Sequence, residues 1–439
     1  MSGLDPSLLF FFNSMAVSRQ RFRVRPVGMD TAGPSDIIVV DLPNSLLDLD
    51  TAALGWKLTT AKGASDCDVV RLSQDTSSLF DSIQVESAGY LVDPGCRQSN
   101  RLAQIALDWT LAPGKQRLKS VLNGQYLDNQ TWATHTAEHM RLNDFSGFLG
   151  SCQPRKIDVS LMGLRVYFKV ADANKAFIGM TNGNVAKDPT TATITLSNIH
   201  FYVDAIEIQD GGVYSAAISR RLSSGPIEIP WRRHYLVQSG PVSNGYNSLL
   251  MNLSVQSLDY LIGVFLSGDK QPYEAVRYPS PYSTGGGSNV LIVDGSTDIK
   301  SGYFLHSIGA GNTWVDSQFS VNAVTYPSFT ADIAESYDQT VQVLGKLKSP
   351  AYGGGKVWLD SLANYRDYAA MHAVSFEFPN GNPESRLKSG LNTLGNMASL
   401  TWNTNTTLGV GAVPPSKLLF AGTTSILRVG QHKSVENVA

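Results

Sequence analysis

Apolar and polar residues alternate along several short stretches of this chain. The clearest is 162–170, where Met, Leu, Val, Phe and Val stand at every second position, and the stretches 38–42, 315–321 and 374–378 behave similarly. A period of two is typical of a β-strand with one buried face. The stretch 260–266 is apolar throughout, so we expect a strand that is covered on both faces.

Two segments repeat their apolar residues with helical spacing instead. Residues 102–109 carry Leu, Ile, Ala and Trp at i, i+3, i+4 and i+7, and 333–347 has a similar stripe, which predicts one helix in each half. Each helix follows a predicted strand that contains a phenylalanine, Phe80 in the first half and Phe319 in the second. A strand-then-helix unit that occurs once per half indicates a duplicated domain of about 200 residues.

The two halves are separated by a segment rich in turn residues. Gly, Asp, Ser and Pro at 209–212 and 223–226 flank a short polar segment, 214–222, and we place the domain junction there. The predicted organisation is an N-terminal arm over 1–35, a first domain over 36–212, a crossover linker over 213–225 and a second domain over 226–439.

The composition is that of a weakly charged globular protein. Of the 439 residues 42% are hydrophobic and only 16% are charged, which excludes a disordered chain. The 39 glycines cluster with Asn, Ser and Pro between short apolar stretches, which favours an all-β protein. Because the formal net charge is −2, any contact with nucleic acid or an anionic membrane has to be local.

The cysteines and the N-terminal residues indicate the cellular compartment in which the chain folds. Cys67, Cys96 and Cys152 lack the paired spacing of a zinc site, and we interpret them as thiols in a reducing compartment. No stretch approaches the roughly 18–20 apolar residues of a membrane-spanning helix. The apolar run 8–12 has no basic residue before it and is a poor secretory signal, so we expect folding in a cytoplasm. We expect no cofactor.

One short string resembles a metal motif. His135, Glu138 and His139 form the HxxEH pattern of inverted zinc peptidases, in which two histidines on one helical face bind Zn²⁺ and the glutamate activates water. Such a site also needs a third ligand and a scaffold of long helices, whereas turn residues flank this string. We therefore interpret the string as part of a polar loop. Neither a GxSxG elbow nor an assignable carboxylate pair points to another active site, so we predict no enzyme and no metal.

Arginines stand at every second position near the N-terminus, namely Arg19, Arg21, Arg23 and Arg25. In an extended segment all four project from one face. One interpretation is an arm that leaves the domain and, together with Phe10, Phe11 and Phe12, contacts a neighbouring subunit, a membrane or packaged DNA. The other is an edge strand with a charged outer face, which protects a sheet against aggregation. The pattern alone leaves both open.

The order of several longer phrases resembles that of double jelly-roll major capsid proteins. Their first barrel opens with a strand pair similar to DLPNSLLDL from Asp41 and LGWKL from Leu54. Polinton-like virus, virophage and adintovirus capsid proteins have a strand-plus-helix segment similar to LFDSIQVESAGYLVD from Leu79 and the following NRLAQIAL. ATITLSNIHFYVDAIEI from Ala192 with the following IPWRRHYLVQSG resembles the closing strand of the first barrel and the crossover into the second, a segment seen also in capsid proteins of large nucleocytoplasmic DNA viruses.

The second half continues the same order. FSVNAVTYPSFTADIAESYDQTVQVLG from Phe319 resembles the strand-plus-helix of the second barrel, and SFEFPNGNPESRLKSGLNT from Ser375 with TTSILRVG resembles its terminal strands. The resemblance spans about residues 36–430 and implies an all-β fold of two tandem eight-stranded antiparallel jelly rolls with short flanking helices. It makes 123–154 and 271–301 candidates for tower or inter-subunit loops.

The resemblance also implies a function. It implies a structural subunit, not an enzyme, whose homotrimers form pseudo-hexagonal capsomers of an icosahedral shell around double-stranded DNA. The implied location is the virion, after assembly inside the host cell. The implied partners are further copies of the chain, neighbouring capsomers, and penton and minor capsid proteins. An internal membrane or packaged DNA would be a further partner, bound through the N-terminal arm.

Three alternatives remain at this stage. A carbohydrate-binding or carbohydrate-degrading β-sandwich would expose an aromatic platform, for which Trp132, Trp314 and Trp358 are candidates. A zinc peptidase would use the HxxEH string. A minor vertex protein of the same viruses needs one jelly roll, whereas this chain has room for two.

Overall fold

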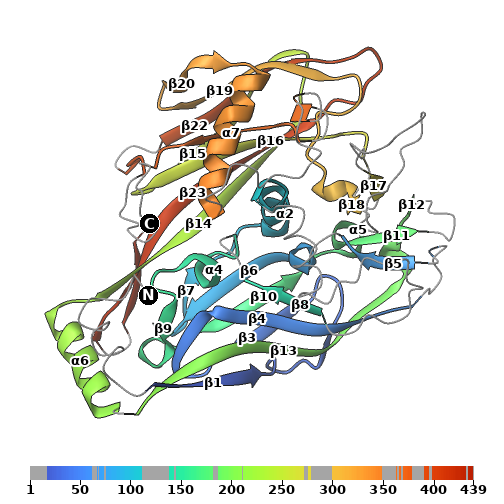
Figure 1. Cartoon of the computed structure of the whole chain (residues 1–439). Coiled ribbons are helices and arrows are strands. Elements are labelled where there is room, and N and C mark those ends of the chain that lie inside the picture. The colour runs from blue at the N-terminus through green and yellow to red at the C-terminus, as the bar shows by residue number, and fades with distance from the viewer. Residues whose placement is uncertain are drawn as a thin grey trace.

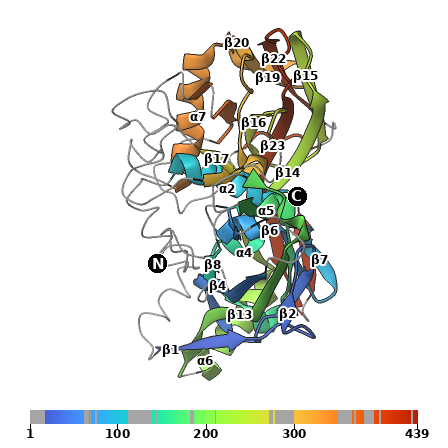
Figure 2. The same ribbon diagram turned by 90° about the vertical axis from the view of Figure 1, so that its right-hand side faces the viewer.

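The computed structural model describes residues 17–61, 67, 69–73, 76–110, 138–142, 145–180, 186–209, 211–270, 275–277, 299–348, 362, 365–366, 369–377, 390–394, 398–431 and 434–438. They form two β-sheet units, one above the other in Figure 1, and the same order is visible in the turned view of Figure 2. Every pairing between named strands is antiparallel, as is usual where each sheet buries one face.

The first unit is a sandwich of two sheets. One sheet has the order β1-β13-β4-β8, with β2 paired to β13 and β9 to β4, and the other has the order β3-β10-β6-β7. The strands are β1 Val17–Val24, β2 Thr31–Ala32, β3 Ile37–Asp41, β4 Leu46–Ala61, β6 Phe80–Ser87, β7 Tyr90–Asp93, β8 Glu138–Arg141, β9 Lys156–Asp158, β10 Arg165–Val170 and β13 Thr193–Ile208. A small sheet of order β12-β11-β5 extends one end, with β5 Val69–Leu72, β11 Phe177–Met180 and β12 Ala186–Lys187.

The second unit repeats this plan. Its sheets have the orders β14-β23-β16-β21, with β24 paired to β23, and β15-β22-β19-β20. The strands are β14 Ile227–Pro241, β15 Gly245–Leu253, β16 Leu258–Leu266, β19 Thr313–Val321, β20 Val324–Ala331, β21 Met371–Ser375, β22 Ala398–Thr407, β23 Ser416–Val429 and β24 Val435–Val438. A separate pair consists of β17 Ala275–Arg277 and β18 Ile299–Ser301.

The strand order defines the topology. Numbered along the chain, the main strands of each unit lie in the order first, eighth, third, sixth in one sheet and second, seventh, fourth, fifth in the other. This is the arrangement of a jelly roll. The predicted fold class, all-β with two tandem jelly rolls, is therefore confirmed.

Most of the strands predicted from alternation are present. In β10 the predicted inward residues Val166, Phe168 and Val170 are buried, and all nine residues of β16 are buried. In β19 a register shift after Trp314 turns Val315 outward, because a bulge reverses the faces of the strand. The strand predicted over 374–378 is displaced, since β21 ends at Ser375.

The helices include both that the periodicity predicts. They are α2 Ser99–Thr110 and α7 Ile333–Lys348, together with α4 Phe148–Ser151, α5 Ala173–Ala176 and α6 Gly211–Ser224, and the 3₁₀ turns η1 Thr76–Leu79, η2 Val159–Leu161, η3 Pro189–Thr191 and η4 Gly302–Phe304. The helix α6 covers 214–222, between the two units, and the periodicity did not predict it. Only Ile218 of α6 is buried among its described side chains, so the helix has little apolar periodicity to reveal it. No helix in the described ranges is long and apolar enough to cross a membrane.

Each hydrophobic core contains residues that belong to the other unit. The core of the first unit includes Ile229 and Trp231 of β14 and Leu427 and Val429 of β23, which belong to the second unit's sheet. Conversely, the apolar stripe of α2 belongs to the second core, where Trp109 packs against Tyr337 and Tyr365 at ring distances of 5.8 and 5.7 Å. Figure 1 shows α2 between the first unit and α7. Each core therefore depends on chain segments of the other unit.

Candidate functional surfaces

The arginine row lies on the edge strand β1. All eight residues of β1 pair with β13, from Val17 opposite Ile208 to Val24 opposite Phe201, and β1 ends its sheet (Figure 1). Phe22 packs against the core of the first unit. Residues 17–24 of the predicted arm thus belong to the sheet, with their arginines on its outer face. Phe10, Phe11, Phe12 lie outside the described residues, and Arg25 is exposed just beyond the strand.

Two of these arginines meet acids of the same chain. Arg19 Nε and Arg21 Nε lie 2.7 Å from the two carboxylate oxygens of Asp204, and Arg19 Nη2 lies 3.1 Å from Asp48 Oδ2. Asp204 is only 6% exposed, so the guanidinium groups cover it. Hydrogen bonding to Asp204 raises the pKa of Arg21 above its usual value. These ion pairs tie β1 to β13 and β4, which is a structural role.

Arg23 joins a different cluster, composed mainly of rings. Its Nη2 donates a hydrogen bond of 2.7 Å to Asn198 Oδ1 and lies 3.2 Å from His200 Nδ1. The ring centroid of His200 is 4.3 Å from that of Tyr202 and 6.3 Å from that of His139. Sequence reasoning missed this cluster, because its members come from three strands and share no local spacing.

The C-terminal end of the HxxEH string forms a strand and not the predicted polar loop. Glu138 and His139 lie on β8, which pairs with β4, so the loop interpretation is wrong for these two residues. His135 is outside the described residues. In the described part of the chain no three His, Cys, Asp or Glu side chains group as metal ligands.

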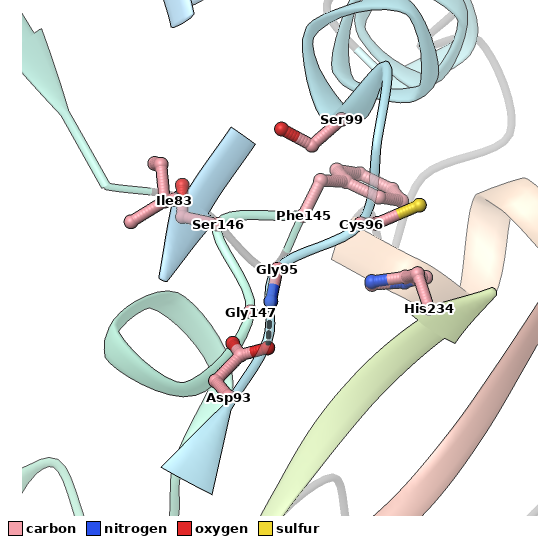
Figure 3. A pocket seen from close by; sticks show the side chains of 9 residues that line it. All are labelled: Ile83, Asp93, Gly95, Cys96, Ser99, Phe145, Ser146, Gly147 and His234. Carbon is pink, nitrogen blue, oxygen red and sulfur yellow. Dashed lines mark hydrogen bonds between the residues drawn. The ribbon is translucent and has the colours of Figure 1, made fainter. Parts of the chain in front are cut away.

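The seam between the two units contains buried charge. Asp93 accepts hydrogen bonds of 2.8 Å from the backbone N–H groups of Gly95 and Phe148, beside a cavity of about 10 Å³ that also contacts His234 (Figure 3). Burial raises the pKa of Asp93 to about 6 and lowers that of His234 to about 3. A Cβ on Gly147, whose φ is +64°, would lie 2.0 Å from Asp93 Oδ2. The cavity holds one water at most, so this seam is a packed joint.

Arginines reinforce the same seam. Arg232 is 5% exposed, pairs with Glu377 and lies over the ring of Tyr260 at 5.0 Å. Arg101 of α2 donates from Nε to the backbone oxygen of Tyr303 at 2.7 Å and lies 3.7 Å from the centre of that ring. The contacts of Arg101 join α2 of the first half to Tyr303 of the second, whereas the contacts of Arg232 lie within the second unit.

The features invoked for other functions are only partly described. Trp314, one candidate for a sugar platform, is fully buried in the second core, while Trp132 and Trp358 lie outside the described residues. The described parts of the first predicted tower loop are 138–142 and 145–154, which include β8 and α4. The described parts of 271–301 are β17 and β18. A tower role for these segments stays a prediction.

Comparison with known proteins shows the fold. No protein-family model matches the sequence. No curated protein matches it either. Among solved structures, PBCV-1 VP54, as fitted into a reconstruction of the virophage Sputnik, superposes with a TM-score of 0.60 and 13% identity over 97% of each chain.

Two further structures agree. The Faustovirus major capsid protein gives a TM-score of 0.57 at 11% identity, covering 95% of this chain and 91% of its own. A chain of the Sputnik virophage structure gives 0.51 at 10% identity, covering 96% and 88%. The likeness spans both units, so the chain has the double jelly-roll fold found in these viral proteins.

Proposed function

We propose that this chain is a major capsid protein, the structural subunit of homotrimeric, pseudo-hexagonal capsomers that tile the icosahedral shell of a double-stranded DNA virus. The observation that carries the proposal is the full-length likeness to PBCV-1 VP54 and the Faustovirus major capsid protein, which includes both jelly rolls and their order in the chain. The role is structural, and we assign no reaction to it.

The physical properties of the chain support this role. Three copies of a two-barrel subunit around a threefold axis present six similar barrels, which gives a nearly hexagonal outline. The shared cores and the contact of Arg101 with Tyr303 join the two units of each subunit into one block, as a shell tile requires. A net charge of −2 permits close packing of copies without strong repulsion.

The proposed partners are other copies of the chain, neighbouring capsomers, and penton and minor capsid proteins. The proposed location is the virion, after assembly inside the host cell. Residues 1–16, which precede β1, are the proposed contact to a neighbour, an internal membrane or DNA through Phe10, Phe11 and Phe12.

Light scattering on the purified chain, followed by negative-stain imaging, tests the proposal. We expect a stable particle of three times 47.5 kDa with a hexagonal outline. A monomer that persists at high protein concentration would contradict the capsomer assignment.

A further inference from the structure

Two histidines flank a glycine in one row across the first sheet. His139 of β8 and His200 of β13 are both cross-strand partners of Gly55 on β4. All three lie on the outer face of the sheet, since the neighbouring Met140 and Phe201 point into the core. Glycine in this row leaves the space between the two rings without a side chain.

The ring nitrogens converge on that space. A Cβ on Gly55 would lie 2.6 Å from His200 Nε2 and 2.8 Å from His139 Nδ1, so the two nitrogens are at most 5.4 Å apart, the sum of these distances. Each ring therefore has a nitrogen close to the same point above the glycine. A Cβ at this position would clash with both rings, so the row requires glycine.

The tautomer of His200 is determined by its other nitrogen. His200 Nδ1 lies 2.5 Å from the backbone oxygen of Asn198 and 3.2 Å from Arg23 Nη2. The carbonyl oxygen is the nearer partner and can only accept, so we assign the proton to Nδ1. Nε2 therefore has a free lone pair. It is buried, in a residue that is 2% exposed, and has no hydrogen-bond partner among the described residues. A histidine whose N–H is held by a backbone carbonyl while its other nitrogen is open is the usual arrangement of a metal ligand.

We propose that His139 and His200 form a binding site for a divalent transition-metal ion, with Zn²⁺ as the ion bound. Imidazole nitrogen is a preferred ligand of this ion, and water completes its coordination. Zn–N bonds of about 2.0–2.1 Å need the two nitrogens within about 4.2 Å. His139 is only partly buried, so its ring can turn to close the difference. The ion would join β13 to β8 across β4.

The surrounding groups set the strength of the site. Burial lowers the pKa of both histidines, which keeps them neutral and able to bind a cation near pH 7. Arg23 is the nearby cation, on the Nδ1 side of His200, and Tyr202 contributes a ring edge. The positive charge of Arg23 weakens cation binding, so its removal will strengthen it. The site is independent of the capsid proposal, because it needs only the first sheet.

Zinc titration of the untagged full-length chain against a chromophoric chelator tests the site. We expect one Zn²⁺ per chain, an affinity loss of at least tenfold in His139→Gln and in His200→Gln, and a several-fold gain in Arg23→Gln. His432→Gln is the control for a histidine elsewhere, and His135→Gln tests the HxxEH string; both should bind as the unaltered chain does. Circular dichroism checks that each variant folds.

A second measurement uses the unaltered chain, so it does not depend on variants folding. Zn²⁺ should protect His139, the more exposed of the two ligands, from modification by diethyl pyrocarbonate, read by mass spectrometry. The proposal is overturned if the chain binds no zinc or if both glutamine variants bind normally. It is also overturned if His135→Gln abolishes binding while His200→Gln does not, because the ion would then belong to the HxxEH string.

Discussion

At the scale of single residues, the buried His372 contributes to the pH dependence of stability. His372 is fully buried, and burial lowers its pKa to about 3. Its Nε2 donates to Gln339 Oε1 at 2.8 Å, and its Nδ1 accepts from the Ser317 hydroxyl at 2.7 Å. The Ser317 oxygen in turn accepts from Trp402 Nε1. Both ring nitrogens have hydrogen-bond partners when the ring is neutral. A second proton on the ring would therefore find no unoccupied acceptor.

We expect His372→Gln to make the protein less sensitive to acid. Between about pH 3 and pH 6.5 the unfolded chain binds a proton at this residue and the native state does not, so stability is lost as pH falls. The buried Asp93 and Asp259, whose pKa values are raised to about 6, act in the opposite sense and remain in the variant. The unfolding free energy is measured by urea denaturation at several pH values. Its slope against pH in this range should be about 1.4 kcal/mol per pH unit smaller in the variant than in the unaltered chain. An unchanged slope would contradict the assignment.

The ion pairs of β1 lead to a second prediction at this scale. Asp48 and Asp204 are cross-strand partners with side chains 12% and 9% exposed, and Arg19 and Arg21 neutralise them. Replacing both arginines by glutamine should cost about 1–3 kcal/mol, because two adjacent carboxylates then repel each other. Asp204→Asn in that background should restore most of the loss. Arg25→Gln, at an exposed position beyond the strand, should change the thermal midpoint little.

At the scale of elements, α2 lies within the first half of the chain but completes the core of the second unit. Leu102→Ala should cost about 2–5 kcal/mol, since Leu102 is fully buried in that core. Hydrogen exchange should therefore quicken in β16 of the second unit. Val213→Ala, a similar truncation on the exposed face of α6, is the control and should have little effect. Faster exchange confined to the first unit would show that α2 does not support the second core.

At the scale of the whole molecule, the position of β1 separates the fold from the proposed arm. Deleting residues 1–16 leaves β1, its ion pairs and Phe22 in place, so we expect trimers to form normally. We also expect shell assembly to fail or weaken, because Phe10, Phe11 and Phe12 are lost. Size-exclusion chromatography and electron microscopy measure the two steps. Shells that assemble at normal yield would show that these residues are not an assembly contact. Deleting 1–30 instead would remove a strand and confuse the two effects.

The amino-acid sequence by itself determined the elements whose apolar residues follow a local period. The alternation over 162–170, the wholly apolar 260–266 and the helical stripe of 102–109 each reflect one backbone geometry, and each corresponds to a strand or helix of the structure. The order of phrases along the chain extended this to the double jelly roll. The same reasoning did not predict α6, because this mostly exposed helix carries almost no apolar stripe.

Only the tertiary structure decided which distant residues meet. Arg21 and Asp204 are 183 residues apart in the sequence, and the row of His139, Gly55 and His200 comes from three strands. The bulge that turns Val315 outward is likewise a property of the pairing of β19 with β22. Such contacts depend on the register of strand pairing and on how one unit completes the core of the other. A local pattern of residues contains no record of either, because cross-strand neighbours are chosen by the whole sheet.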